Sequence, residues 1–279
     1  MSILEVLGPE AADTPLVLDS PHSGSAYPAD FVTAVPMEQV RRAEDFDVHA
    51  LFGTAPALGV PLLHALFPRI YVDVNRTEAD IDPASITGAL PFAPAPSAKA
   101  ALGKGVIWME APPPPARTPL YEAPLPAAAA VARLSAYWQP YRARLSALLH
   151  AVRARHGRAF YLDCHSMQSV STAMHEEGAG LPRPEIVLGD RDGTTCAPNF
   201  TRLVAEALTA AGFEVAVNAP YKGADLVVAH GRPSEGFHAL QIEVRRDLYM
   251  DEVSVTRSAR FDDTRDRLGL ALKTIRDGV

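Results

Sequence analysis

The chain has only two cysteines, Cys164 and Cys196, among its 279 residues. Two cysteines are too few for the disulfide framework of a small secreted protein, and a chain of this length can bury a core without such cross-links. The N-terminus lacks a basic region followed by a sustained apolar run, so it does not resemble a signal peptide. We therefore expect a cytoplasmic protein.

Long apolar runs and an excess of positive charge are also missing. No uncharged stretch approaches the roughly 20 residues that a membrane span requires, so we expect no membrane partner. The net charge is 26 − 33 = −7, which argues against a nucleic-acid partner, because phosphate backbones are bound by clustered lysines and arginines. Nothing in the sequence indicates an oligomeric state.

Several common catalytic motifs are absent. Gly103-Lys-Gly105 is not a phosphate-binding loop, because the chain contains no Gly-x4-Gly-Lys-Ser/Thr pattern. No Gly-x-Ser-x-Gly elbow occurs, which argues against a serine hydrolase. Cys164 adjoins His165, but neighbouring strand residues point to opposite faces, so a thiol–imidazole pair is poorly placed.

Short apolar segments alternate with amphipathic ones, which is typical of an α/β protein. We expect strands at 16–18, 60–67, 70–74, 185–188, 213–217 and 239–244, and another that ends at 162. We expect helices at 37–58, 126–155, 199–211 and 254–275. This alternation predicts a mostly parallel sheet covered on both faces. No linker is apparent, so we expect a single domain over residues 1–279.

The segment 77–126 is rich in proline and holds 11 of the chain's 25 prolines. Proline lacks a backbone donor and interrupts regular structure. Long irregular segments in compact domains are usually lids or binding loops, or else disordered. Residues 103–108 form an apolar island inside the segment and predict local order there.

Two histidines, His22 and His165, follow apolar segments in the same context of small polar residues. In open α/β sheets ligands bind at the carboxyl ends of strands. One such histidine would more often be structural, but two with matching surroundings favour a shared metal site. A catalytic zinc usually has three protein ligands and a water. Glu44 or Asp45, in the expected helix 37–58, could supply the third ligand; alternatively, with Asp47, they form a solvated acidic face.

Glu243 lies in an apolar strand, where a carboxylate is costly to bury unless it is paired or functional. It could be the general base that deprotonates a water, or it could pair with Arg245 or Arg246 at a sheet edge. Asn75 and Arg76 end the expected strand 70–74. Arginine binds carboxylates through a bidentate fork, so Arg76 could clamp an acidic substrate, although a surface role is the alternative.

Lys222 and His230 are weaker candidates for substrate contacts. Both lie in glycine-containing segments, Pro-Tyr-Lys-Gly and Ala-His-Gly, and both could be ordinary loop residues.

A series of short motifs runs through almost the whole chain. The motifs are Ser-Pro-His-Ser-Gly at 20–24, Glu-Asp at 44–45, Tyr-Val-Asp-Val-Asn-Arg at 71–76, Gly-Val-Ile at 105–107, Asp-Cys-His-Ser at 163–166, Leu-Gly-Asp-Arg-Asp-Gly at 188–193, Pro-Tyr-Lys-Gly at 220–223, His-Gly at 230–231, Leu-Gln-Ile-Glu at 240–243 and Tyr-Met at 249–250. Each motif is weak alone, but the ordered set is specific. Taken in this order, the motifs resemble those of the N-formylglutamate amidohydrolase (N-formylglutamate deformylase) family.

The resemblance implies a three-layer α/β/α domain with a mixed, largely parallel sheet. This phosphorylase/hydrolase-like fold is related to those of zinc carboxypeptidases and aspartoacylases. The resemblance also implies one zinc ion held by His22, Asp45 and His165, with Glu44 as the fallback for Asp45. Glu243 falls at the position of the general base.

The implied activity is zinc-dependent hydrolysis of N-formyl-L-glutamate to formate and L-glutamate, the last step of one histidine-degradation route. Asn75 and Arg76 would bind one substrate carboxylate, and Arg69, Arg191 or Arg245 would bind the other. Arg76 or Lys222 would stabilise the oxyanion. Two alternatives remain open: an amidohydrolase for another N-acyl or N-carbamoyl acidic amino acid, and a non-catalytic metabolite-binding protein of the same fold.

Overall fold

A seven-stranded mixed sheet forms the centre of the molecule. The computed structural model describes residues 2–113 and 116–279, so Pro114 and Pro115 of the proline-rich segment lie outside the described residues. The strand order is β1-β3-β2-β8-β11-β9-β10. The bounds are Leu4–Leu7 for β1, Leu16–Ser20 for β2, Leu62–Ala65 for β3, Ala159–Met167 for β8, Ile186–Gly189 for β9, Val215–Val217 for β10 and Phe237–Arg245 for β11.

The four central strands β3, β2, β8 and β11 are parallel to one another. The edge strand β1 is antiparallel to β3, and β9 is antiparallel to β11. The predicted mixed, largely parallel sheet is therefore confirmed. Because the parallel strands share their carboxyl ends, side chains from distant parts of the sequence meet at that edge of the sheet.

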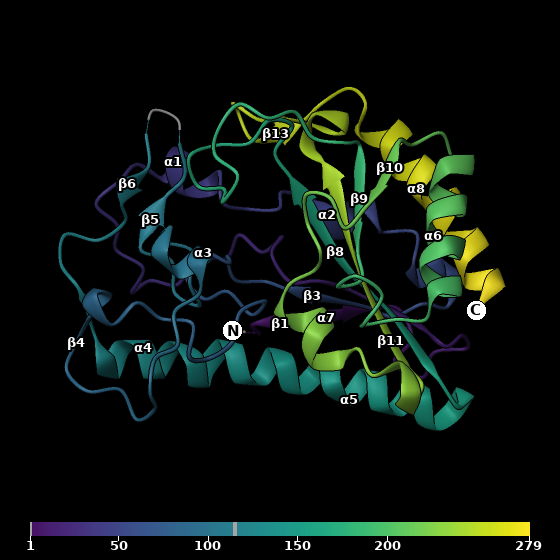
Figure 1. The fold of residues 1–279 in the computed structure, drawn as a ribbon, viewed down its shortest axis with the longest axis horizontal. Coiled ribbons are helices and arrows are strands. Elements are labelled where there is room, and N and C mark those ends of the chain that lie inside the picture. The colour runs from purple at the N-terminus through teal and green to yellow at the C-terminus, as the bar shows by residue number, and fades with distance from the viewer. Residues whose placement is uncertain (1, 114–115) are drawn as a thin grey trace.

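Helices cover both faces of the sheet and produce three layers (Figure 1). One face packs against α5 (Gln139–His156) and α7 (Asp225–His230). The other packs against α2 (Val48–Leu51), α6 (Pro198–Ala210) and α8 (Phe261–Gly278). This confirms the predicted α/β/α architecture. Among the described residues, we find no helix with the length and hydropathy needed to cross a membrane.

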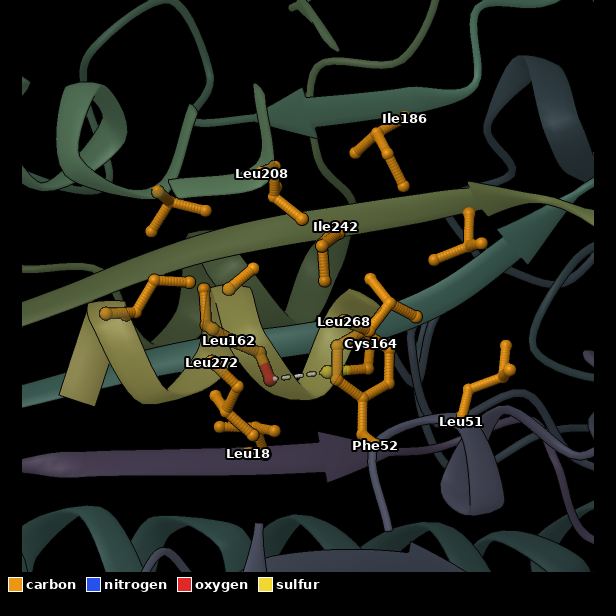
Figure 2. Packing of buried hydrophobic residues seen from close by; sticks show 14 of the residues in the cluster. Leu18, Leu51, Phe52, Leu162, Cys164, Ile186, Leu208, Ile242, Leu268 and Leu272 are labelled. Atoms are coloured by element: carbon orange, nitrogen blue, oxygen red, sulfur yellow. Dashed lines mark hydrogen bonds between the residues drawn. The ribbon is translucent and has the colours of Figure 1, made fainter. Parts of the chain in front are cut away.

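Strand alternation separates an apolar face from a polar one. Leu162 and Cys164 of β8 pack with Leu18 and Ile242 of the neighbouring strands beneath α8 (Figure 2). Each buried leucine of this kind contributes about 1.5–3 kcal/mol. Burial also raises the pKa of the Cys164 thiol well above its ordinary value. Cys164 is thus a core side chain, and His165 points to the opposite face, as the alternation predicted.

The longest predicted helix, 126–155, is confirmed as a continuous helical run. It consists of α4 (Ala127–Arg133), a π-helical turn (Leu134–Trp138) and α5. Tyr141, Leu145, Leu148 and Val152 recur at helical spacing and are buried against the sheet. Gly157 ends the helix with a φ of +77°, a left-handed conformation that glycine adopts without a steric penalty.

The expected helix 37–58 is wrong as a single element. The structure has α1 (Met37–Arg41), then α2, then a short 3-10 turn (Pro56–Leu58). Between α1 and α2 the Asp45 amide donates to the His22 carbonyl at 3.0 Å instead of to a helical partner. Asp47 then adopts a left-handed φ of +54°. This break holds Asp45 beside His22.

Two further expectations are corrected. Residues 70–74 form a buried turn instead of a strand: the Tyr71 amide bonds to Pro68, and the Asp73 amide donates to the Val106 carbonyl at 2.7 Å. The last helix begins at Phe261 and not at 254, because Thr256–Arg257 (β13) pairs with Met250–Asp251 (β12) before it.

The proline-rich segment is ordered over its described residues and lies beside the sheet (Figure 1). It carries a small apolar cluster that includes Ile81, Val106 and Ile107, which confirms the local order expected at 103–108. Its elements are a 3-10 turn (Pro83–Ser85), β4 (Ile86–Thr87), α3 (Ala98–Ala101), β5 (Glu110–Ala111), β6 (Thr118–Pro119) and β7 (Leu125–Pro126).

Candidate metal centre and substrate pocket

Three buried side chains converge beyond the carboxyl ends of the central strands. His22 follows β2, Asp45 lies in the break between α1 and α2, and His165 is near the end of β8. Asp45 Oδ2 lies 3.3 Å from His22 Nδ1 and 3.0 Å from His165 Nδ1. Glu44 turns away and accepts hydrogen bonds from Tyr27 and Arg41. The geometry therefore groups Asp45, and not Glu44, with the two histidines.

The three side chains fit a tetrahedral metal ion. Ligand atoms bound at about 2.0 Å in a tetrahedron lie about 3.3 Å apart, close to the two separations measured from Asp45 Oδ2. His22 Nδ1 is buried, yet among the described residues it has no hydrogen-bond partner. Two imidazoles and one carboxylate form a donor set that suits zinc.

A buried carboxylate holds the outer nitrogen of each histidine. His22 Nε2 lies 2.7 Å from Asp73 Oδ1, and His165 Nε2 lies 2.7 Å from Asp163 Oδ1. Although burial lowers the pKa of His165, the Asp163 carboxylate holds it well above the ordinary value. Such carboxylates orient the ring and direct its other nitrogen toward a metal. Asp163 is thus a partner of His165 and lies outside the three-residue cluster.

Two arginines occupy the remaining oxygen of Asp45. Arg246 Nη2 donates to Asp45 Oδ1 at 3.0 Å, and Arg69 Nη1 does so at 3.4 Å. Burial alone would raise the pKa of Asp45, but Arg69 and the two histidines hold it well below its ordinary value. Arg69 also donates to Asp73 at 3.0 Å. Asp45 therefore stays ionised and directs Oδ2 toward the histidines.

Glu243 lies directly beside this cluster. In the parallel pairing of β8 with β11, Glu243 is the cross-strand partner of His165. Its side chain lines a pocket and accepts a hydrogen bond from Gln241 at 2.9 Å. Burial raises the pKa of Glu243 to about 7. A carboxylate with a pKa near neutrality can both accept and return a proton.

The pocket has a volume of about 400 Å³ and is strongly cationic. Eight lysine and arginine side chains line it, against two carboxylates, Glu176 and Glu243. The whole chain carries a net charge of −7, so this positive charge is a local feature. A pocket of this kind favours anionic ligands.

Residues 14–250 match the family model of N-formylglutamate amidohydrolases. The chain belongs to this family. It is 30% identical over 256 residues to the N-formylglutamate deformylase of Pseudomonas aeruginosa, an alignment that covers 89% of this chain and 86% of that protein. It is also 41% identical to an N-formylglutamate amidohydrolase of Ralstonia eutropha with a known crystal structure. That superposition has a TM-score of 0.90 and covers 99% of this chain and 97% of the other. The chain is therefore a hydrolase that acts on an amide.

Within this amidohydrolase, Asn75 and Arg76 both line the pocket. The Asn75 amide is already engaged, since Nδ2 donates to Asp163 at 3.0 Å and Oδ1 accepts from the Leu226 amide at 2.8 Å. Asn75 therefore helps to hold Asp163. Arg76 donates from Nε to the Lys104 carbonyl at 3.1 Å, and its guanidinium borders the pocket.

The other predicted substrate residues are placed differently. Lys222 lines the pocket, but its ammonium is half-exposed and pairs with Asp192 at 2.8 Å. His230 lies outside the pocket lining and packs edge-on against Tyr161, where burial lowers its pKa to about 4. Arg245 also lies outside the lining and donates to Asp247 at 2.7 Å.

Sequence reasoning missed Asp73, Trp108 and Lys104, and it considered Arg246 only as a partner of Glu243 and not of Asp45. An aspartate inside the apolar run 70–74 was a usable signal for Asp73. Trp108 Nε1 donates to Asp73 at 3.2 Å. The sequence offers no comparable signal for Arg246, which reaches Asp45 from a 3-10 turn (Arg246–Leu248) just after β11.

Proposed function

We propose that this amidohydrolase hydrolyses N-formyl-L-glutamate to formate and L-glutamate with zinc held by His22, Asp45 and His165. The observation that carries the proposal is the position of Glu243, which lies beside the three-residue cluster and faces a cationic pocket. The relatives are an N-formylglutamate deformylase and an N-formylglutamate amidohydrolase, which supports this choice of substrate.

Zinc, Glu243 and Arg69 would each have a separate role in the reaction. When bound, zinc is a Lewis acid that polarises a carbonyl and lowers the pKa of water. Glu243 accepts a proton from the water that attacks the formyl carbon. It then returns that proton to the amide nitrogen as the C–N bond breaks, which releases formate and the free amine. Arg69 lines the pocket beside Asp45 and would stabilise negative charge on the carbonyl oxygen.

The substrate carries two carboxylates, which suits the charge of the pocket. Arg76 would bind one of them from the pocket wall with the guanidinium hydrogens that do not donate to the Lys104 and Asn75 carbonyls. This activity would complete a histidine-degradation route, as the family resemblance implies.

The test is formate release from purified protein with a panel of substrates. N-formyl-L-glutamate should give the highest kcat/KM, a chelator should abolish turnover, and added zinc should restore it. Amine release only from N-acetyl or N-carbamoyl acidic amino acids would instead support the alternative amidohydrolase. Absence of turnover with every N-acyl amino acid would contradict an enzymatic role.

A further inference from the structure

The Gly103-Lys104-Gly105 turn places a buried lysine in the wall of the pocket. Lys104 lines the pocket and is 8% exposed. Gly103 has a φ of +77°, and a Cβ there would lie 2.2 Å from Glu110 Cγ. A Cβ on Gly105 would lie 2.3 Å from the Asp80 carbonyl oxygen. Both glycines are therefore needed for the chain to pack closely on either side of Lys104.

The backbone of Lys104 is fixed at both ends. Its amide donates to the Lys99 carbonyl at 2.8 Å, and its carbonyl accepts from Arg76 Nε at 3.1 Å. The turn thus ties the lysine to Arg76, which lines the same pocket. The backbone of Lys104 is therefore fixed beside Arg76.

The Lys104 ammonium has no counter-ion in the described part of the chain, where no carboxylate lies within 4.0 Å of it. The other two lysines that line the pocket are paired, Lys99 with Glu176 at 3.6 Å and Lys222 with Asp192 at 2.8 Å. Burial, followed by the charges of Lys99 and Arg76, lowers the pKa of Lys104 well below its ordinary value. A buried cation among cations is costly, and a bound anion would remove that cost.

We propose that Lys104 binds the side-chain carboxylate of the substrate, and so selects dicarboxylic N-formyl amino acids over neutral ones. Arg76, held against the same turn, is left for the α-carboxylate. The choice of a formyl amino acid rests on the proposed function. The inference that the turn binds a second carboxylate rests on the buried, uncompensated lysine.

The first test compares two substrates that differ only in the charge of the side chain, N-formyl-L-glutamate and N-formyl-L-glutamine. Lys104→Met should lower kcat/KM for the glutamate compound by about 10- to 100-fold, the range for a lost hydrogen bond to a charged group. The value for the glutamine compound should fall by clearly less, because its uncharged amide oxygen accepts only a weaker bond from the ammonium. Lys273→Met is the matched control, because Lys273 is exposed on α8 and pairs with Asp277.

Two outcomes would overturn the inference. An equal loss with both substrates would show that Lys104 acts on the scissile group or on the structure, and an unchanged ratio would show that it binds no side-chain carboxylate. Melting temperature and zinc content report whether each variant is folded. Lys104→Gln carries a different neutral side chain and should give the same ratio of kcat/KM for the glutamate compound to kcat/KM for the glutamine compound. It replaces Lys104→Met if that variant fails to fold.

A binding measurement separates this inference from the proposed function. By calorimetry, metal-free wild-type protein should bind glutarate more tightly than butyrate, and Lys104→Met should abolish that preference. If no N-formyl amino acid is turned over but the preference for glutarate depends on Lys104, the proposed function fails and the carboxylate site stands. If N-formylglutamate is turned over and Lys104→Met keeps the preference, the carboxylate site alone fails.

Discussion

Asp163 lies beside the nitrogen of His165 that faces away from Asp45. Its carboxylate lies 2.7 Å from His165 Nε2, which leaves Nδ1 directed at Asp45. We expect Asp163→Asn to weaken zinc binding by about 10- to 100-fold, since an amide orients the ring less strongly and donates no charge to it. Competition with a chromophoric chelator would measure the dissociation constant. Asp262→Asn, an exposed change on α8, is the control; equal zinc affinity in both variants would contradict this role.

Glu243 should control the pH dependence of turnover. Its pKa is raised to about 7 by burial, so the base form is lost as the pH falls through that value. A bound cation favours the carboxylate, so the acid limb of kcat/KM should lie at or below about pH 7. Glu243→Gln should keep zinc, lose turnover by about 10²- to 10⁴-fold and lose this limb.

Glu206→Gln, an exposed change on α6, should leave the pH profile intact. Persistence of the same acid limb in Glu243→Gln would show that another group is the base.

For individual residues, the sequence identifies site residues that lie in or after strands better than site residues that lie in turns. His22, His165 and Glu243 were identifiable because each interrupts or follows an apolar run. Arg246 was not, because β11 ends at Arg245 and the following 3-10 turn redirects the next side chain to Asp45, 201 residues away in sequence. The alternation of the strand pointed to Arg245 instead.

Among the helices and strands, the clearest difference between prediction and structure is the break between α1 and α2, where a single helix was expected. The residues 37–58 have helical spacing, but the bond from the Asp45 amide to the His22 carbonyl replaces a helical one. Local pattern cannot report a bond to a strand end elsewhere in the chain. By contrast, the helix 126–155 was predictable, because its apolar residues face one sheet without interruption.

The relative stabilities of two substitutions at Asp47 test whether the chain breaks between α1 and α2 or continues as one helix. Asp47 has a φ of +54°, and a left-handed conformation costs a residue with a Cβ about 1–2 kcal/mol relative to glycine. Asp47→Gly should therefore be more stable than Asp47→Ala by about 1 kcal/mol in urea unfolding. Both variants lose the same bond from Arg257, so that loss cancels. In a continuous helix alanine would be the more stable by about 1 kcal/mol, and that order would contradict the break.

At the scale of the whole molecule, the fold concentrates positive charge that the overall composition hides. The pocket draws its cations from the end of α1, the turn after β3, the proline-rich segment, the segments after β9 and β10, and the turn after β11. The net charge of −7 indicated only that nucleic acid is an improbable partner. The cationic pocket depends on how the sheet order brings these segments together, and no local pattern in the sequence contains that order.

The central claim is that His22, Asp45 and His165 hold the zinc on which hydrolysis of N-formyl-L-glutamate depends. The most direct measurement is formate release by wild-type protein and by His165→Ala, each stripped of metal and then reloaded with zinc. His150→Ala, an exposed change on α5, is the matched control. Reloaded wild-type protein and the control should bind about one zinc per chain and release formate, while His165→Ala should do neither. Full activity in stripped wild-type protein, or in His165→Ala, would contradict the claim.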